Sequence, residues 1–175
     1  MPTIRPLAPA DTDAYHAARL QMLREAHSAF LTDAEEFATR PLSAVADRLK
    51  PNPNNITFGA WDGPELVGLV TLVREDSPRS CHRAHIYGMG VLERAQGQGV
   101  GGALLRTAVA YARELPGVLS LHLDVMETQE GARRLYESLG FQVWGTEPNA
   151  MCVGGQLLQA HAMWLDLSTP SGKQA

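Results

Sequence analysis

Glycines crowd one short stretch in the middle of the chain, Gln96-Gly97-Gln98-Gly99-Val100-Gly101-Gly102. An apolar helical pattern begins directly after them, because Val100, Leu104 and Ala108 recur at every fourth position. No Ser, Thr, Asp or Asn stands at the helix start to cap its free N–H groups. Glycines let a ligand approach the backbone closely, and the helix dipole adds partial positive charge there. The stretch therefore predicts a seat for a phosphate or pyrophosphate rather than a mobile surface turn.

The same glycines also satisfy the dinucleotide-binding pattern GxGxxG over residues 97–102. In that pattern the first glycine ends the first strand of a repeated βαβ fold. Here residues 93–96 separate the motif from the preceding strand, and a single βαβ unit follows it. No Gly-Lys-Ser/Thr is present, which excludes a Walker A loop. A nicotinamide oxidoreductase remains an alternative that would require NAD binding and a second βαβ half.

The elements that must position this turn follow from the spacing of apolar residues. An opening edge strand near Ile4 is followed by a helix that Asp11 or Asp13 caps, and the pattern then weakens over residues 27–41. Beyond it we expect helices at 42–49, 100–115 and 132–139, and strands at 56–61, 65–74, 85–92, 119–125, 141–145 and 157–167. A strand, a helix and a strand around the glycines imply a crossover and a parallel strand pair in an α/β domain.

Length and composition bound the class of protein. The chain has 175 residues, which suits one domain, predicted at residues 1–167 with a polar tail at 168–175. The net charge of −4 excludes a basic nucleic-acid footprint at the level of composition. No signal peptide is recognisable, and apolar runs such as residues 67–73 are too short to span a bilayer. Cys81 and Cys152 form no disulfide framework. We expect a cytoplasmic protein with no nucleic-acid or membrane partner.

A second motif follows the glycines: Ala132-Arg133-Arg134-Leu135-Tyr136, then Leu139-Gly140-Phe141. Together with Gln96-Gly97-Gln98-Gly99-Val100-Gly101, it resembles the paired signature of the GNAT acetyltransferases, in their order and separation. The resemblance extends from Asp11 to Leu167. It implies the GNAT fold, a mixed and mostly antiparallel twisted sheet of about six to seven strands flanked by about four helices. A central parallel pair of strands would splay apart in that sheet.

The resemblance also implies acetyl-CoA as co-substrate. The backbone of Gln96 to Gly102 would hold its pyrophosphate, the main chain of Met89 and Val91 would pair with the pantetheine arm, and Tyr136 would protonate the leaving thiolate. Gln129 stands where the family usually has Asn, which leaves one pantetheine contact open. The implied cofactor-binding residues are Met89, Val91, Gln96, Gly97, Gln98, Gly99, Val100, Gly101, Gly102, Gln129 and Tyr136.

The acceptor that the resemblance implies is a primary amine of a small molecule, peptide or protein, which attacks the thioester directly in a ternary complex. Making the ammonium neutral at pH 7 costs about 4.6 kcal/mol, so a general base would help. The family often places a carboxylate six residues before the valine that ends the central strand, and here that position is His85. A neutral imidazole can accept the proton. On a regular strand His85 shares a face with Tyr87 and Met89, opposite Gly88 and Gly90, unless a bulge intervenes.

Several alternatives stay open at this stage. His85 is either the base or a histidine that packs and hydrogen-bonds, and the acidic residues Asp33, Glu35 and Glu36 either attract a cationic amine or form a solvated loop. Cys81, His82 and His85 match no metal-ligand spacing, so we expect no metal. A second class is a GNAT-like domain that senses acyl-CoA without turnover. The identity of the acceptor is not predicted, and the protein is expected to be a monomer or a homodimer.

Overall fold

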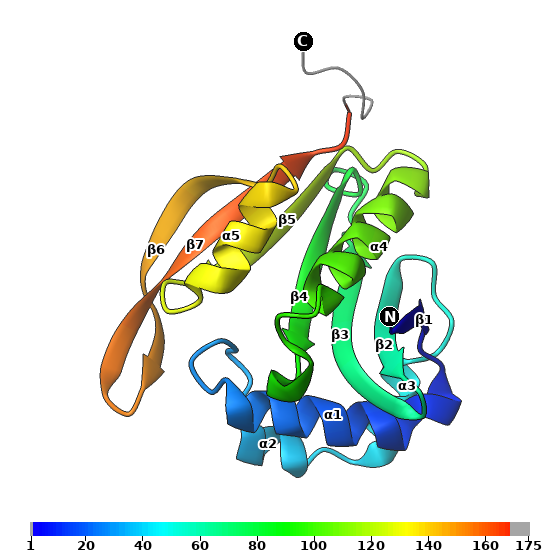
Figure 1. The fold of residues 1–175 in the computed structure, drawn as a ribbon. Coiled ribbons are helices and arrows are strands. Elements are labelled where there is room, and N and C mark those ends of the chain that lie inside the picture. Colours follow the sequence, from blue (N-terminus) through cyan, green and yellow to red (C-terminus); the bar gives the residue numbers. More distant parts are fainter. Residues whose placement is uncertain (1, 169–175) are drawn as a thin grey trace.

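Seven strands form one mixed sheet in the order β1-β2-β3-β4-β5-β7-β6 in the computed structural model, which describes residues 2–168 (Figure 1). The parallel pair is β4–β5, and the other neighbouring strands are antiparallel. This confirms the predicted fold class. Apart from Ser168, the predicted tail at 168–175 lies outside the described residues. The strands are β1 (Thr3–Pro6), β2 (Asn55–Asp62), β3 (Glu65–Arg74), β4 (Arg83–Val91), β5 (Ser120–Met126), β6 (Gln142–Val153) and β7 (Gln156–Asp166).

Helices cover both faces of the sheet. One face carries α4 (Val100–Glu114) and α5 (Glu130–Ser138), and the other carries α1 (Thr12–Glu25), α2 (Ala34–Ala38) and α3 (Leu42–Arg48) (Figure 1). Short 3₁₀ turns, η1 (Pro9–Asp11) and η2 (Glu93–Ala95), precede α1 and α4. Among residues 2–168, no helix combines the length and the apolar character that crossing a bilayer requires.

The helix α2 is one more than the number expected, and it lies in the segment whose pattern weakens. Five residues are too few to show a helical period. Asp33 caps this helix, because its carboxylate accepts hydrogen bonds from the backbone N–H groups of Glu35 and Glu36. Asp33, part of the acidic cluster, therefore helps to form a helix that borders the functional cavity described below.

The sheet separates two hydrophobic layers. On one side α4 is the central element, with Leu104, Leu105 and Ala108 fully buried against strand residues such as Leu72 and Leu121. Each fully buried leucine contributes about 1.5–3 kcal/mol to stability relative to an exposed one. On the other side α1 and α3 bury a smaller cluster, Leu7, Ala18, Met22, Leu49, Leu66, Leu69 and Leu92. These layers fix both helical groups to the middle of the sheet.

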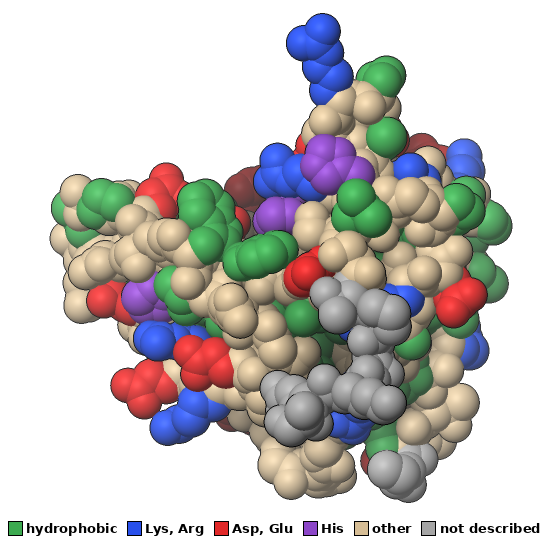
Figure 2. All heavy atoms as spheres, turned by 90° about the horizontal axis from the view of Figure 1, so that it is seen from above, with side chains coloured by type: hydrophobic (Ala, Val, Ile, Leu, Met, Phe, Trp, Pro, Cys, Tyr) green, Lys and Arg blue, Asp and Glu red, His purple; other side chains and the backbone are tan. Residues whose placement is uncertain are grey.

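The β6–β7 hairpin reaches away from these layers. Apolar side chains gather on its surface, where Val143, Trp144 and Leu157 are exposed (Figure 2). The two strands pair along most of their length with register shifts between Val143 and Gly145 and between Glu147 and Met151. The hairpin is thus held to the body of the sheet through the β5–β7 ladder.

Candidate active site

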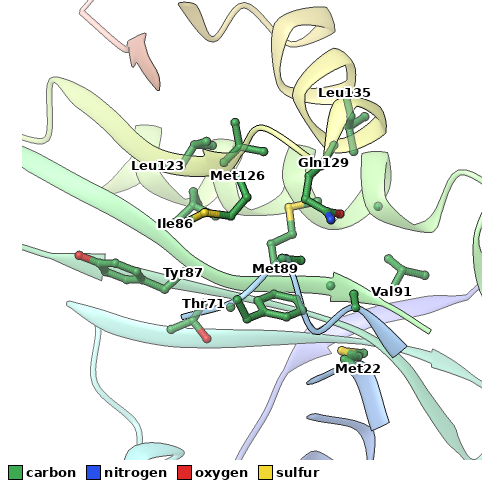
Figure 3. Close-up of a pocket in the computed structure, with 18 of the residues that line it drawn as sticks. Met22, Thr71, Ile86, Tyr87, Met89, Val91, Leu123, Met126, Gln129 and Leu135 are labelled. Carbon is green, nitrogen blue, oxygen red and sulfur yellow. The ribbon is translucent and has the colours of Figure 1, made fainter. Parts of the chain in front are cut away.

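The parallel strands β4 and β5 part midway along the sheet. Within the described residues they pair at Arg83–Ser120, Ala84–Leu121 and His85–His122, and no ladder joins them beyond these pairs. The free edge of β4 from Ile86 to Val91 and that of β5 from Leu123 to Met126 line a cavity of about 1220 Å³ (Figure 3). The predicted splay is therefore present, and it begins at His85.

The predicted site residues come together at this cavity. All of them except Gln98 line it, namely His85, Met89, Val91, Gln96, Gly97, Gly99, Val100, Gly101, Gly102, Gln129 and Tyr136. The side chain of Gln98 instead donates a hydrogen bond to the carbonyl oxygen of Arg94 at 3.1 Å. The side chain of Gln98 therefore packs on the turn that precedes α4 and lies outside the cavity lining.

The glycine-rich turn forms one end of the cavity, which we call the donor end. Gly97 and Gly99 have φ angles of +73° and +79°, a left-handed conformation that glycine adopts without a Cβ penalty. Gly99 is the N-cap of α4, and no side chain caps that helix, as the sequence predicts. The side chain of Gln96 donates to the carbonyl oxygen of Val91 at 3.0 Å and ties the turn to the end of β4. The free N–H groups and the dipole of α4 together favour a bound anion.

A β-bulge changes which side chains of β4 point to this end. Tyr87 pairs with Thr71 and Gly90 with Leu69, so two residues of β4, Gly88 and Met89, oppose a single residue of β3. Gly88 has a φ angle of +57°. The bulge overturns the regular-strand expectation that His85, Tyr87 and Met89 share a face.

Contacts confirm the change of face. A Cβ on Gly101 would lie 3.7 Å from Val91 Cγ2 and 3.8 Å from Met89 Cε, so these side chains point toward α4. A Cβ on Gly90 would lie 3.1 Å from the sulfur of Met22, on the α1 side. Figure 3 shows Met89 and Met22 on opposite sides of β4. The cavity thus has a donor end on the α4 face and a second end, the acceptor end, on the face of α1, α2 and α3.

His85 lies where the strands part, and Glu75 supports it. The Nε2 atom of His85 lies 2.7 Å from Glu75 Oε1, and Arg83 Nη1 lies 3.5 Å from the same oxygen. Hydrogen bonds from Ser80 and His85 hold the pKa of Glu75 at about 2, so this carboxylate is ionised at neutral pH. An ionised carboxylate can only accept, so Nε2 of His85 donates to it. Neutral His85 therefore presents Nδ1 as its proton acceptor.

Two more rings border His85. His122 pairs with His85 in the β4–β5 ladder, and their ring centroids lie 5.3 Å apart. Tyr87 stacks on His85 with ring centroids 5.7 Å apart. Burial, followed by the nearby charges of Arg83 and His85, lowers the pKa of His122 to about 4. The Nε2 atom of His122 also lies 2.9 Å from Ser120 Oγ. At neutral pH His122 is accordingly an uncharged neighbour of His85.

Tyr136 is held at the cavity wall by α5. Its side chain is 7% exposed and packs edge to face on Phe141 with centroids 5.9 Å apart. Burial raises the pKa of Tyr136 to about 12. A phenol of this kind keeps its proton at neutral pH and is available as a hydrogen-bond donor.

The loop before α5 closes the cavity from another side. Gln129 is the N-cap position of α5, and its side-chain amide donates to Thr128 Oγ1 at 3.3 Å. Thr128 in turn donates to the carbonyl oxygen of Ser28 at 3.3 Å, across 100 positions of the chain. The segment after α1 and the loop before α5 are joined by this contact.

Sequence patterns alone missed Glu75 and His122. Glu75 lies just beyond β3, and its link to His85 depends on the β3–β4 register, in which Val73 pairs with His85. A hairpin register worked out from residues 65–91 would have brought Glu75 near His85. His122 becomes visible only when the parallel partner of β4 is known.

Comparison with known proteins gives the class. The model of the acetyltransferase (GNAT) family matches residues 20–141. The N-alpha-acetyltransferase RimI of Mycobacterium tuberculosis is 33% identical over 129 residues, which cover 73% of this chain and 77% of that protein. The chain therefore belongs to the GNAT acetyltransferase family, as its two motifs indicate.

Other similarities define the fold and the extent of the match. The structure of YncA, a putative acetyltransferase from Salmonella typhimurium with its cofactor acetyl-CoA, has a TM-score of 0.81 at 21% identity, over 100% of this chain and 99% of that one. N-acetyltransferase 8F1 of Rattus norvegicus is 33% identical over 114 residues, or 63% of this chain and 51% of the relative. The chain spans about half or less of the length of the first curated relatives that it matches.

Proposed function

We propose that this protein is an N-acetyltransferase that transfers the acetyl group of acetyl-CoA to a primary amine within a ternary complex. The observation that carries the proposal is the parted β4–β5 pair, which opens beside the uncapped, glycine-lined start of α4. Membership of the GNAT family and the names of the relatives support the same activity. A strand edge and a helix N-terminus in one cavity suit a ligand that has an amide-containing arm and a pyrophosphate.

The donor binds through backbone groups in this proposal. The N–H groups from Gln96 to Gly102 hold the pyrophosphate, because every residue of this stretch except Gln98 lines the cavity and α4 has no side-chain cap. The free edge of β4 at Met89 and Val91 hydrogen-bonds the pantetheine arm as a strand would. Gln129 lines the cavity next to that arm and replaces the usual Asn contact.

Proton removal from the acceptor falls to His85. Glu75 accepts from Nε2 and leaves Nδ1 to take the ammonium proton, directly or through a water. The ionised carboxylate then stabilises the imidazolium that forms. The neutral amine attacks the thioester carbonyl carbon, and the backbone N–H of Met89 stabilises the oxyanion.

Collapse of the tetrahedral intermediate breaks the C–S bond and releases the thiolate. The hydroxyl of Tyr136 donates a hydrogen bond to this sulfur. Its pKa of about 12 lies above that of a thiol, about 8.5, so Tyr136 retains its proton more tightly than the product thiol does. We therefore assign Tyr136 to stabilisation of the leaving group and expect the final proton to come from the protonated amide product or from water.

Thiol release with acetyl-CoA and a broad amine panel tests the proposal, beside calorimetric binding of acetyl-CoA and NAD. Binding of acetyl-CoA with thiol release on one or more amines is the expected result. Binding without release from any amine would favour the second candidate, an acyl-CoA sensor. If acetyl-CoA does not bind, the proposed role of Gln96 to Gly102 is wrong.

A further inference from the structure

A buried arginine lies at the acceptor end of the cavity. Arg19, in the middle of α1, is only 7% exposed, and it lines the cavity. Its Nη1 donates to the carbonyl oxygen of Gly88 at 3.2 Å, and its guanidinium lies 4.3 Å from the ring centroid of Phe30. The bulge on β4 thus provides one acceptor for a group that has five N–H donors.

No carboxylate neutralises this charge. Among residues 2–168, no Asp or Glu oxygen lies within ion-pairing distance of Arg19. Burial lowers the pKa of Arg19, and the charges of Arg48 and Arg40 act in the same direction. A buried cation without a counter-ion is costly, and an anion in the cavity would offset that cost.

Two further guanidinium groups line the same end. Arg40, which follows α2, pairs with Glu36 at 2.8 Å, and Arg48 is exposed in the last turn of α3. In the described part of the chain Arg48 has no carboxylate within ion-pairing distance. Three arginines from three segments therefore surround one end of the cavity.

The opposite charge borders the other side of this end. Tyr87 is flanked by Glu75 and Asp124, whose charges raise its pKa in addition to the larger effect of its burial. Glu75 also holds His85, the proposed base. Gly88, which Arg19 contacts, follows His85 by three residues on β4, a span of about 10 Å at most. Of these two carboxylates, Asp124 lines the cavity, and Glu75 lies behind His85 and also pairs with Arg83. The arginines and the proposed base therefore lie close enough for one small molecule to span them.

We propose that the acceptor is an amine that also carries a carboxylate, as in an amino acid, and that Arg19, Arg40 and Arg48 bind this carboxylate. The guanidinium fork matches a carboxylate geometrically and binds it through two parallel hydrogen bonds. The carboxylate would hold the acceptor so that its amine faces His85 and the thioester at Met89. This inference rests on the proposed function and adds the chemical class of the substrate.

The test compares amino acids with their primary amides as acceptors in the thiol-release assay. Both members of each pair carry the same α-amine, and only the amide lacks the anionic group. We expect kcat/KM for the preferred amino acid to exceed that for its amide by about tenfold or more. Higher salt should raise KM for the acid and leave KM for the amide unchanged.

Variants locate the effect. Arg48 is exposed and Arg40 is half-buried, and each of Arg40→Gln and Arg48→Gln should raise KM for the amino acid roughly threefold to tenfold while kcat changes less than about twofold. Arg24→Gln is the matched control, because Arg24 is an exposed arginine of α1 that pairs with Glu35 outside the cavity lining. Arg19→Lys keeps the buried charge, loses the fork and should raise KM most, with folding checked by thermal melting.

The outcomes separate the two levels of the proposal. If amides are acetylated as well as the acids, or if Arg40→Gln and Arg48→Gln leave KM unchanged, the carboxylate site is wrong and the acetyltransferase activity stands. If acetyl-CoA fails to bind, or if no amine in either panel is acetylated, the proposed function is wrong and the carboxylate site is wrong with it.

Discussion

The two ends of the cavity differ in the groups that line them, backbone groups at the donor end and side chains at the acceptor end. The donor end is made of backbone, in one contiguous stretch from Gln96 to Gly102, and its conformation depends on left-handed glycines and an uncapped helix. The acceptor end is made of side chains from α1, α2, α3, β4 and the segment after β3. A backbone site binds a ligand that does not vary, whereas a side-chain site can change its specificity by substitution. The following experiments test that division, from the largest expected effect to the smallest.

His85→Ala should have the largest effect. We expect kcat to fall by about 10²–10³, because the acceptor loses its general base, while the Kd of acetyl-CoA stays unchanged. Pre-steady-state acetyl transfer and calorimetry measure the two quantities separately. His161→Ala is the control, since His161 lies on β7, hydrogen-bonds Thr146 and is outside the cavity lining. If the Kd of acetyl-CoA rose in His85→Ala by as much as kcat fell, the assignment of separate functions to the two ends would be wrong.

Gly99→Ala should act on the donor end alone. A Cβ at a φ angle of +79° costs about 1–2 kcal/mol, and relief of that strain would move the N–H groups at the start of α4. We expect the Kd of acetyl-CoA to rise about tenfold. Gly63→Ala is closely matched, because Gly63 has a φ angle of +56°, equally open surroundings and a place in the β2–β3 turn. Equal Kd values for the two variants in calorimetry would contradict a backbone-built donor site.

Glu75→Gln should lower kcat by roughly tenfold, because the amide stabilises the imidazolium of His85 less well than the carboxylate does. The pKa of Glu75, about 2, lies below its ordinary value, so the carboxylate remains ionised down to about pH 3 and contributes no limb to the pH–rate profile above it. In Glu75→Gln the acid limb of that profile should move to lower pH. An unmoved limb would mean that Glu75 acts on the fold and not on the proton transfer.

Tyr136→Phe should reduce kcat by roughly threefold to tenfold and leave KM for the acceptor unchanged. The thiolate is a good leaving group, so a lost hydrogen bond slows its departure without preventing it. Steady-state rates with the natural thioester and with a thioester of lower leaving-group pKa measure this effect. The difference between wild type and variant should shrink with the better leaving group, and a constant difference would assign Tyr136 to packing.

The prediction for His122 concerns stability and leaves both ends of the cavity unchanged. Its folded pKa of about 4 lies below the ordinary value of about 6.5, so the unfolded chain binds more protons between these values. The contribution of His122 to the free energy of unfolding should therefore be complete above about pH 6.5 and should decrease as the pH drops toward 4. His122→Asn should flatten this part of the curve in urea titrations at several pH values. An unchanged slope would place the acid sensitivity elsewhere.

The donor end could be predicted from the sequence more fully than the acceptor end, because its residues are contiguous in the chain. The two motifs predicted the fold class and the splayed strands through the resemblance to the GNAT family, and they marked residues 96–102 as the proposed donor site because those residues are contiguous in the chain. Glu75, His122 and Arg19 carry no motif and become neighbours of the site only through strand register and the β4 bulge. The α2 helix was missed because its cap, Asp33, appears in the sequence as one member of an acidic cluster.

The bulge at Gly88 has a consequence for how this sequence can vary. The extra residue at the bulge changes which face of the sheet the following side chains point to. Gly90, beyond the bulge, lies toward α1, whereas Met89 and Val91 point toward α4. The number of residues in β4 is therefore constrained, in addition to the residue types at His85 and at Gly88, whose φ angle is +57°. A conservative substitution at Ile86 or Met89 would keep this arrangement of faces, whereas deletion of one residue would restore strict alternation and turn the last side chains of the strand to the opposite layer.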